Sequence, residues 1–224
     1  MTTPELVLMA LTDARLPTGG HTQSAGLEPA VHAGLAADGR RLHEVVDYAR
    51  DRLRTVVRVD AGAAVVARFL SRSGGDPLRV EPHWAARTPS AVLRAASRRQ
   101  GRGCLRLAAR IWPAVLDHLP ADAEIARPVV MGVVAAVTGL SAEQTALMVG
   151  YDDAQTVVAA ALKLLPVDPV EAAGWGVALH PQIAELAADL SDLIEPERIS
   201  GAGAPLVDVF AEQHSRRRLR LFHA

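Results

Sequence analysis

The chain has 224 residues, of which 50 % are hydrophobic and 22 % charged, and its formal net charge is −1. This composition can bury a core, which excludes wholesale disorder, and the near-neutral charge argues against a dedicated nucleic-acid binder. The single cysteine, Cys104, excludes a disulfide framework and a zinc site made of cysteines. We see neither a signal-peptide pattern nor an uncharged apolar stretch of about 18 residues, so we expect a soluble, cytoplasmic protein.

The predicted elements are helical along the whole chain. Aromatic residues make up 4 % of the total, and the apolar content is mostly alanine, leucine and valine, which suits closely packed helices. Apolar spacing and turn residues predict helices over residues 4–11, 25–33, 41–57, 60–70, 88–119, 128–140, 141–166, 168–190 and 206–213. We therefore expect a single all-α domain over residues 1–224, a bundle of about eight to ten helices.

Four helix starts carry capping signals. Asp60 can cap the segment that follows it, and Thr88 precedes a proline that suits a first helical turn. Ser141 and Gln144 have the spacing of a capping box, in which each satisfies an end group of the other. Asp168, followed by Pro169, predicts the start of a helix that extends to about residue 190.

Motifs for nucleotide and metal binding are missing from the sequence. A P-loop needs a lysine behind a glycine-rich cradle, whereas Lys163, the only lysine, stands between two leucines of a predicted helix. No two histidines are spaced three or four residues apart, so we expect separate surface or capping histidines. The histidines are His21, His32, His43, His83, His118, His180, His214 and His223.

A serine hydrolase is one alternative that the sequence leaves open. Residues 22–26 differ by one residue from a nucleophile elbow, which would need glycine in place of Thr22 and a strand before it. In this alternative Ser24 is the nucleophile, with His21 as base and Asp13 as the orienting acid. Because no strand is predicted there, we interpret Ser24 as a helix cap or contact residue.

Arginines spaced by four predict a positive stripe on the helix expected from residue 88. Two interpretations remain open: a solvated face balanced by acids of neighbouring helices, or a docking face for an acidic partner, a phosphate or a nucleic acid. Gly101 and Gly103 interrupt this helix and favour close approach of another backbone, from the same chain or another. The stripe consists of Arg94, Arg98, Arg102, Arg106 and Arg110, with Arg99 beside it.

Five blocks in order resemble the UreF family of urease accessory proteins. Residues 11–20 together with 24–28 are similar to the family's N-terminal signature, and Arg220-Leu221-Phe222 is similar to its terminus. The three blocks between them are 97–102, 127–132 and 161–166. The family usually has an aromatic residue and a histidine around the serine, where this chain has His21 and Gln23, and it often ends in serine rather than Ala224.

The resemblance implies a non-enzymatic maturation factor. UreF-like proteins are helical dimers that join UreD (also called UreH) and the nickel-carrying GTPase UreG. The assembly loads nickel into apo-urease, and UreF is thought to couple or gate GTP hydrolysis. By this resemblance we expect no tightly bound cofactor, nickel handled only within the accessory complex, and neither a membrane nor a nucleic acid as partner.

Partner-binding residues also follow from the matching blocks. We expect the turn around residues 17–20, with Glu28, to shape a surface for UreG. We expect the tail 216–224 to be flexible in the free protein and to order on UreD, with Phe222 in an apolar pocket and Arg220 making a charge-assisted hydrogen bond. The expected partner-binding set is Pro17, Gly19, Gly20, Ser24, Glu28, Arg98, Gln100, Arg102, Arg220, Leu221 and Phe222.

Overall fold

The computed structural model describes residues 3–13 and 15–222, without the side chains of His21 and Asp38. In this part of the chain the regular elements are all helices, which confirms the predicted all-α class. The helices are α1 Pro4–Leu11, α2 Leu27–His32, α3 His43–Arg54, α4 Val56–Ser73, α5 Val80–Ala86, α6 Ala91–Ile111, α7 Arg127–Thr138, α8 Ala142–Leu164, α9 Pro169–Ala178, α10 His180–Leu190 and α11 Pro205–Ser215.

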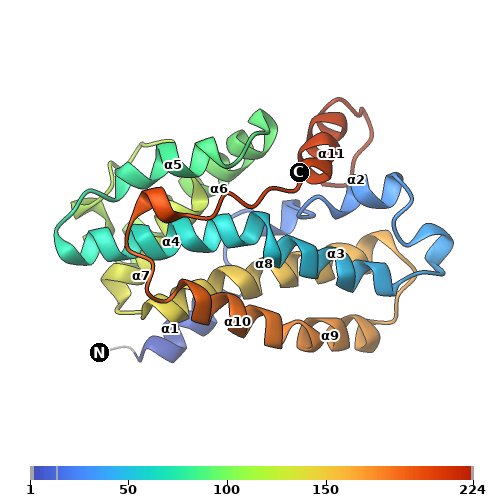
Figure 1. Ribbon diagram of the computed structural model, residues 1–224, viewed down its shortest axis with the longest axis horizontal. Helices are drawn as coiled ribbons and strands as arrows, with labels where there is room; N and C mark the ends of the chain where they lie inside the picture. The colour runs from blue at the N-terminus through green and yellow to red at the C-terminus, as the bar shows by residue number, and fades with distance from the viewer. Residues whose placement is uncertain (1–2, 14, 223–224) are drawn as a thin grey trace.

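Helix α4 is the centre of the bundle. It crosses the middle of the molecule, with α5 and α6 on one side and α9 and α10 on the other (Figure 1). Its residues belong to two apolar clusters, one shared with α3, α8 and α10 and one shared with α6 and α7. A Cβ atom added at Gly132 of α7 would lie 2.2 Å from the carbonyl oxygen of Ala64, so the backbones of α4 and α7 are in direct contact.

The chain breaks between α3 and α4 at Thr55, where we expected a continuous helix to residue 57. Thr55 has φ −120° and ψ −100°, and its hydroxyl donates to the carbonyl oxygen of Asp51 at 2.6 Å. Such a bond competes with the helical pattern of the backbone. The predicted capping role of Asp60 is wrong, because Asp60 lies inside α4 and its carboxylate accepts a hydrogen bond from Trp84 Nε1 at 2.6 Å.

Two other expected helices are shorter than predicted. Helix α6 is capped by Ser90 rather than Thr88, and it ends at Ile111 because Pro113 opens a 3₁₀ turn over Pro113–Asp117. The expected helix over 168–190 is divided into α9 and α10. Pro181, which has no N–H and whose ring would clash with a carbonyl four residues back, accounts for that division.

Other boundaries agree with the sequence analysis. Helix α1 covers the predicted residues, and α11 extends the predicted 206–213 by one residue before and two after. The capping box of Ser141 and Gln144 is present at the start of α8, and Asp168 caps α9 by accepting hydrogen bonds from two backbone N–H groups. Local cap chemistry was therefore a reliable guide at these two positions.

Candidate functional site

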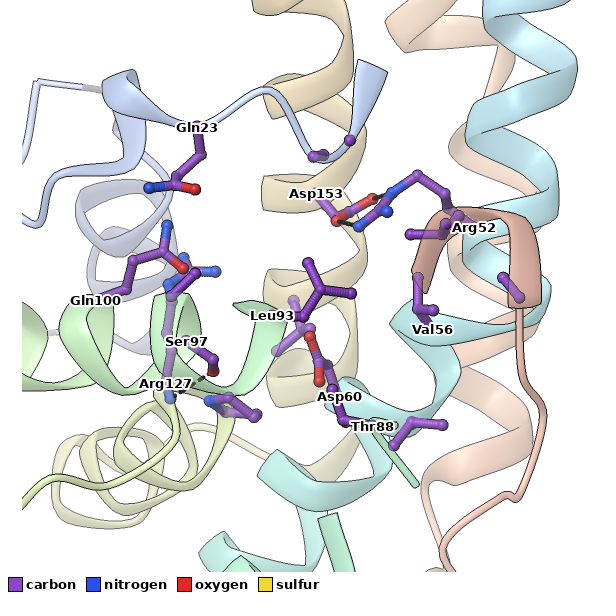
Figure 2. A pocket seen from close by; sticks show the side chains of 18 of the residues that line it. Gln23, Arg52, Val56, Asp60, Thr88, Leu93, Ser97, Gln100, Arg127 and Asp153 are labelled. Atoms are coloured by element: carbon purple, nitrogen blue, oxygen red, sulfur yellow. Dashed lines mark hydrogen bonds and ion pairs between the residues drawn. The ribbon is translucent and has the colours of Figure 1, made fainter. Parts of the chain in front are cut away.

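A cavity of about 150 Å³ with several charged lining residues lies among the helices of the bundle. Figure 2 shows Arg52 and Asp153 at one end of it, Gln23 and Gln100 at the other, and Asp60 between them. Most of its charged side chains come from α3, α4, α7 and α8, and two others are Arg87, which follows α5, and Asp208 of α11. Core helices therefore supply much of the wall, and loop segments complete it.

Two consecutive aspartates of α8 bind arginines from different helices. Arg52 of α3 donates two hydrogen bonds to Asp153, at 2.5 and 2.9 Å. Arg127 of α7 lies 2.8 Å from Asp152. Burial opposes the charge of both arginines, yet the facing carboxylates raise the pKa of each guanidinium above its usual value. These pairs join α8 to α3 and α7 across the cavity.

Asp60 differs from Asp152 and Asp153, because its hydrogen bond comes from the neutral indole of Trp84 rather than from an arginine. Burial raises the pKa of Asp60 to about 6, an effect that the hydrogen bond from Trp84 partly offsets and the nearby charge of Asp153 reinforces. The cavity therefore contains one carboxylate whose charge changes near neutral pH.

A second cavity of about 280 Å³ shares Arg127 and Asp152 with the first one. Its wall also includes Thr18 of the glycine-rich turn, Lys163 of α8 and Phe222 of the tail. Segments from both ends of the chain thus complete the wall of the same internal space.

The end of the described chain is docked onto the domain by Glu28. The N–H groups of Leu221 and Phe222 donate to the two carboxylate oxygens of Glu28 at 2.7 and 2.8 Å. His214 Nε2 lies 3.1 Å from the carbonyl oxygen of Phe222 and 3.4 Å from Glu28 Oε2. The Phe222 ring is 3 % exposed, and Lys163 Nζ lies 5.1 Å from its centre.

This docking corrects two expectations. The tail 216–224 was expected to be flexible in the free protein, with Phe222 in a pocket of the partner, whereas in the structure the Phe222 ring joins the chain's own apolar cluster around α3, α8 and α10. Glu28 was expected on an exposed surface, but it is 3 % exposed and holds the tail. Leu221, by contrast, is 60 % exposed and Leu219 is 89 % exposed. His223 and Ala224 lie outside the described residues.

The glycines of α6 are close-contact positions within this chain. A Cβ atom at Gly101 would lie 2.0 Å from the carbonyl oxygen of Ile125, and one at Gly103 would lie 3.0 Å from that of Thr18. The backbone that approaches α6 is therefore intramolecular at both positions. Gly19, in the same turn as Thr18, has φ +83°, a conformation that favours glycine.

The hydrolase alternative has no support in the geometry. Ser24 is fully buried, and its hydroxyl oxygen accepts a hydrogen bond from the N–H of Glu28 at 3.3 Å, which matches a contact role. Asp13 binds Arg15 at 2.6 Å, and this arginine lowers the pKa of Asp13 to about 2. The side chain of His21, the expected base, lies outside the described residues.

The arginine stripe is only partly free. Arg98 lies 2.8 Å from Glu81, Arg102 lies 3.5 Å from Glu124, and Arg94 donates to two backbone carbonyls before α6. Among the residues that the structure describes, Arg99, Arg106 and Arg110 have no ion pair. Acidic residues outside α6 thus balance two arginines of the stripe, as expected if the stripe is a solvated face.

The structure separates the expected partner-binding residues into groups. Gly20 and Gln100 line the first cavity, Gly19, Gln100 and Arg220 line an open groove, and Glu28 meets Leu221 and Phe222. Pro17 and Arg102 are exposed and line none of these spaces. The cavity residues Arg52, Asp60, Asp152 and Asp153 were missed, although two adjacent acids in the apolar run of α8 were a visible signal.

Two other kinds of site are missing from the described part of the chain. No group of three or more histidine, cysteine, aspartate or glutamate side chains is placed to hold a metal ion. Among the same residues, no helix combines the length and the apolar character needed to span a bilayer.

Comparison with known proteins gives one consistent result. The UreF family model matches residues 40–180. The urease accessory protein UreF of Mycobacterium sp. (strain JLS) is 40 % identical over 215 residues, and that of Mycolicibacterium vanbaalenii is 40 % identical over 222; each alignment covers 96 % of both chains. The protein of the same name from Mycobacterium marinum is 37 % identical over 223 residues, covering 96 % of this chain and 97 % of its own.

These matches and the helical fold define the class of the protein as a urease accessory protein. Within this class, the chain belongs to the UreF family, which is a family of non-enzymatic chaperones.

Proposed function

We propose that this chain is a cytoplasmic, homodimeric scaffold that joins UreD/UreH and the GTPase UreG while nickel is loaded into apo-urease. The observation that carries the proposal is the UreF match, because curated relatives align with 96 % of the chain at up to 40 % identity. Nickel is the cargo of the assembly in this proposal. The chain itself supplies binding surfaces and leaves GTP hydrolysis to UreG.

The docked tail supports a role in binding UreD/UreH. Phe222 is buried and anchors the segment, whereas Leu219 and Leu221 are exposed beside it. Arginine is enriched at protein interfaces, and the exposed leucines beside the tail arginines offer apolar surface that a partner can bury. We infer that Leu221 contacts the partner and that Phe222 holds Leu221 in place, which revises the expected role of Phe222 as the inserted residue.

Capture of the partners tests the proposal. The full-length chain should co-purify with UreD/UreH and UreG when the three are produced together, and it should restore urease activity in cells that lack their own UreF. Deletion of residues 220–224 should abolish capture of UreD/UreH while helicity and dimerisation remain. Failure of the full chain to bind either partner would overturn the proposed function.

The cargo and GTP parts of the proposal need separate measurements. Calorimetry on the isolated protein should detect neither micromolar GTP binding nor a tight nickel site, because we place both functions in the assembly. UreG turnover of GTP should change when the chain and UreD/UreH are added together. Tight nickel or GTP binding by the isolated chain would contradict this division of roles.

A further inference from the structure

The second half of α6 carries a row of exposed arginines on a helix that contains no acidic residue. Arg102, Arg106 and Arg110 follow one another at intervals of four, so they lie along one side of the helix. Arg102 lies 3.5 Å from Glu124, whereas neither Arg106 nor Arg110 has an ion pair among the residues that the structure describes. Two neighbouring positive charges near the end of α6 therefore face solvent without a balancing acid.

The dipole of α6 accounts for only one of these two charges. A cation in the last turn of a helix is stabilised by the carbonyl groups that point out of that end, and Arg110 lies in the last turn of α6. This stabilisation falls off within the last turn, and Arg106 lies one turn earlier. Among the described residues, neither the helix end nor an acidic neighbour thus gives Arg106 a structural role.

An exposed isoleucine adjoins the two arginines. Ile111 is the last residue of α6, and it is 50 % exposed. Pro113 opens a 3₁₀ turn two positions later and restricts the backbone there. Arg106, Arg110 and Ile111, which we call the α6 end surface, thus combine two positive charges and an apolar side chain on one ordered element.

The α6 end surface is separate from the docked tail. Helix α11 meets the start of α6, where Glu212 accepts hydrogen bonds from Ser90 and Val92. Arg106 comes 14 positions after Val92, which corresponds to about 21 Å along the axis of an α-helix. None of the three residues of the α6 end surface lines the two internal cavities or the groove that contains Arg220.

We propose that the α6 end surface binds an acidic helix of a protein partner, with two carboxylates on Arg106 and Arg110 and an apolar side chain on Ile111. Carboxylates four residues apart on a helix are separated by about 6 Å along its axis, which is the spacing of the two arginines. Arginine binds carboxylates through paired, charge-assisted hydrogen bonds. The proposal rests on the proposed function, because it assigns a surface by which the scaffold holds a protein of urease maturation.

The apolar contact favours a protein over a nucleic acid. The phosphate groups that dominate nucleic-acid binding offer no apolar side chain to Ile111. Dedicated nucleic-acid binders also carry an excess of basic residues, whereas the formal net charge of the whole chain is −1. An acidic amphipathic helix supplies both the carboxylates and the apolar side chain.

The first test reverses the two charges in the full-length protein. The double variant Arg106→Glu and Arg110→Glu is compared with Arg40→Glu and Arg79→Glu, which makes the same change in net charge at exposed arginines outside α6. Interferometry measures the association and dissociation rates for purified UreD/UreH, UreG and apo-urease of the same organism, one at a time. Circular dichroism and thermal melting verify that both variants are folded.

We expect the double variant at Arg106 and Arg110 to associate with one of these proteins about tenfold more slowly at low salt, because exposed charges act mainly on the association rate. The control should change by less than about threefold. The difference should shrink at 1 M salt, where charges are screened beyond about 3 Å. Reversal to arginine of two acidic residues one turn apart on that protein should restore part of the rate.

The second test removes the apolar contact. Ile111→Gln should raise the dissociation rate from the same protein about fivefold and change the association rate by less than about twofold, because short-range apolar contacts act mainly on dissociation. Ile194→Gln is the matched control, since Ile194 is 45 % exposed and lies outside α6. The control should leave both rates unchanged.

The outcomes distinguish this surface from the proposed function. Wild-type rates in either test, or equal changes in a variant and its control, would overturn the α6 end surface while the proposed function stands. If the wild-type chain binds none of the three proteins, the proposed function fails and the α6 end surface fails with it. A labelled single-stranded oligonucleotide and inorganic phosphate serve as further probes. If the double variant loses binding of either probe at physiological salt and the control keeps it, the surface belongs to that ligand and the acidic helix is excluded.

Discussion

The internal cavity and the surface groove use arginine in opposite ways. In the cavity, Arg52 and Arg127 each form an ion pair with an aspartate of α8, and these ion pairs connect α8 to α3 and α7. In the groove, Arg99 and Arg220 face solvent without a partner among the described residues. Arginines thus connect helices in one region and are exposed at the surface in the other. Stability measurements should separate these roles.

The largest effect is expected from breaking a cavity ion pair. Asp153→Ala would leave Arg52, whose side chain is 11 % exposed, without its carboxylate, and we expect a loss of about 3 kcal/mol in the free energy of unfolding. Asp189→Ala is the control, because its pair with Arg58 is at the surface and should cost less than about 1 kcal/mol. Urea denaturation measures the free energy of unfolding of both variants. Equal losses would contradict the claim that the cavity ion pair contributes more to stability than the surface ion pair.

Two helical glycines allow a comparison between a position in close backbone contact, Gly101, and a position with open space around it, Gly174. Gly101→Ala should cost about 2 kcal/mol, because its new Cβ would meet the carbonyl oxygen of Ile125 and force backbone to move. Gly174→Ala, inside α9 with nothing within 4 Å, should instead stabilise the protein by up to about 1 kcal/mol. Thermal and urea unfolding should show opposite signs, and a neutral Gly101→Ala would refute the contact.

Asp60 makes the cavity sensitive to pH. Its pKa is about 6 in the folded chain, whereas the ordinary value for an aspartate is 3.8, so the folded state binds more protons than the unfolded state between these values. The free energy of unfolding should therefore fall by about 2 kcal/mol as pH rises from 4 through the folded-state pKa to about 7, and remain level above that pH. Asp60→Asn keeps an acceptor for Trp84 and should remove this fall. Parallel pH profiles for the two proteins would exclude a raised pKa.

The smallest effect concerns the tail. Glu28→Ala should cost about 1 kcal/mol, since the released N–H groups of Leu221 and Phe222 regain hydrogen bonds to water. Release should also speed trypsin cleavage after the tail arginines, which mass spectrometry can follow. Glu195→Ala, at an exposed glutamate, is the control and should leave the cleavage rate unchanged. Equal cleavage of wild type and Glu28→Ala would show that Glu28 does not hold the tail.

Local chemistry made much of the fold predictable, because the information lies within a few residues. The capping residues Ser141 and Asp168 were identified for this reason. The breaks at Thr55 and before Pro181 were missed, since apolar spacing continued across both. Pro181 indicated a helix break, but the apolar periodicity on both sides of it led us to predict one continuous helix.

The candidate site was less predictable, because its contacts join distant residues. Phe222 and Glu28 are 194 positions apart, and no local pattern indicates that a buried carboxylate receives the chain end. The two adjacent acids, Asp152 and Asp153, can be recognised in the sequence. The arginines that bind them come from two other helices, and the sequence alone does not predict how those helices pack. Arg220 was identified by resemblance, and only the fold places it in the same groove as Arg99.

The bond between Glu28 and the tail has a consequence for the order of events during synthesis. Phe222 lines the second cavity, so this part of the wall is missing during synthesis until residue 222 has left the ribosome. A chain stopped before residue 222 would keep the described helices, because α11 ends at Ser215, but it would lack this part of the wall. The contact with Glu28 therefore forms only after the last described helix has been synthesised.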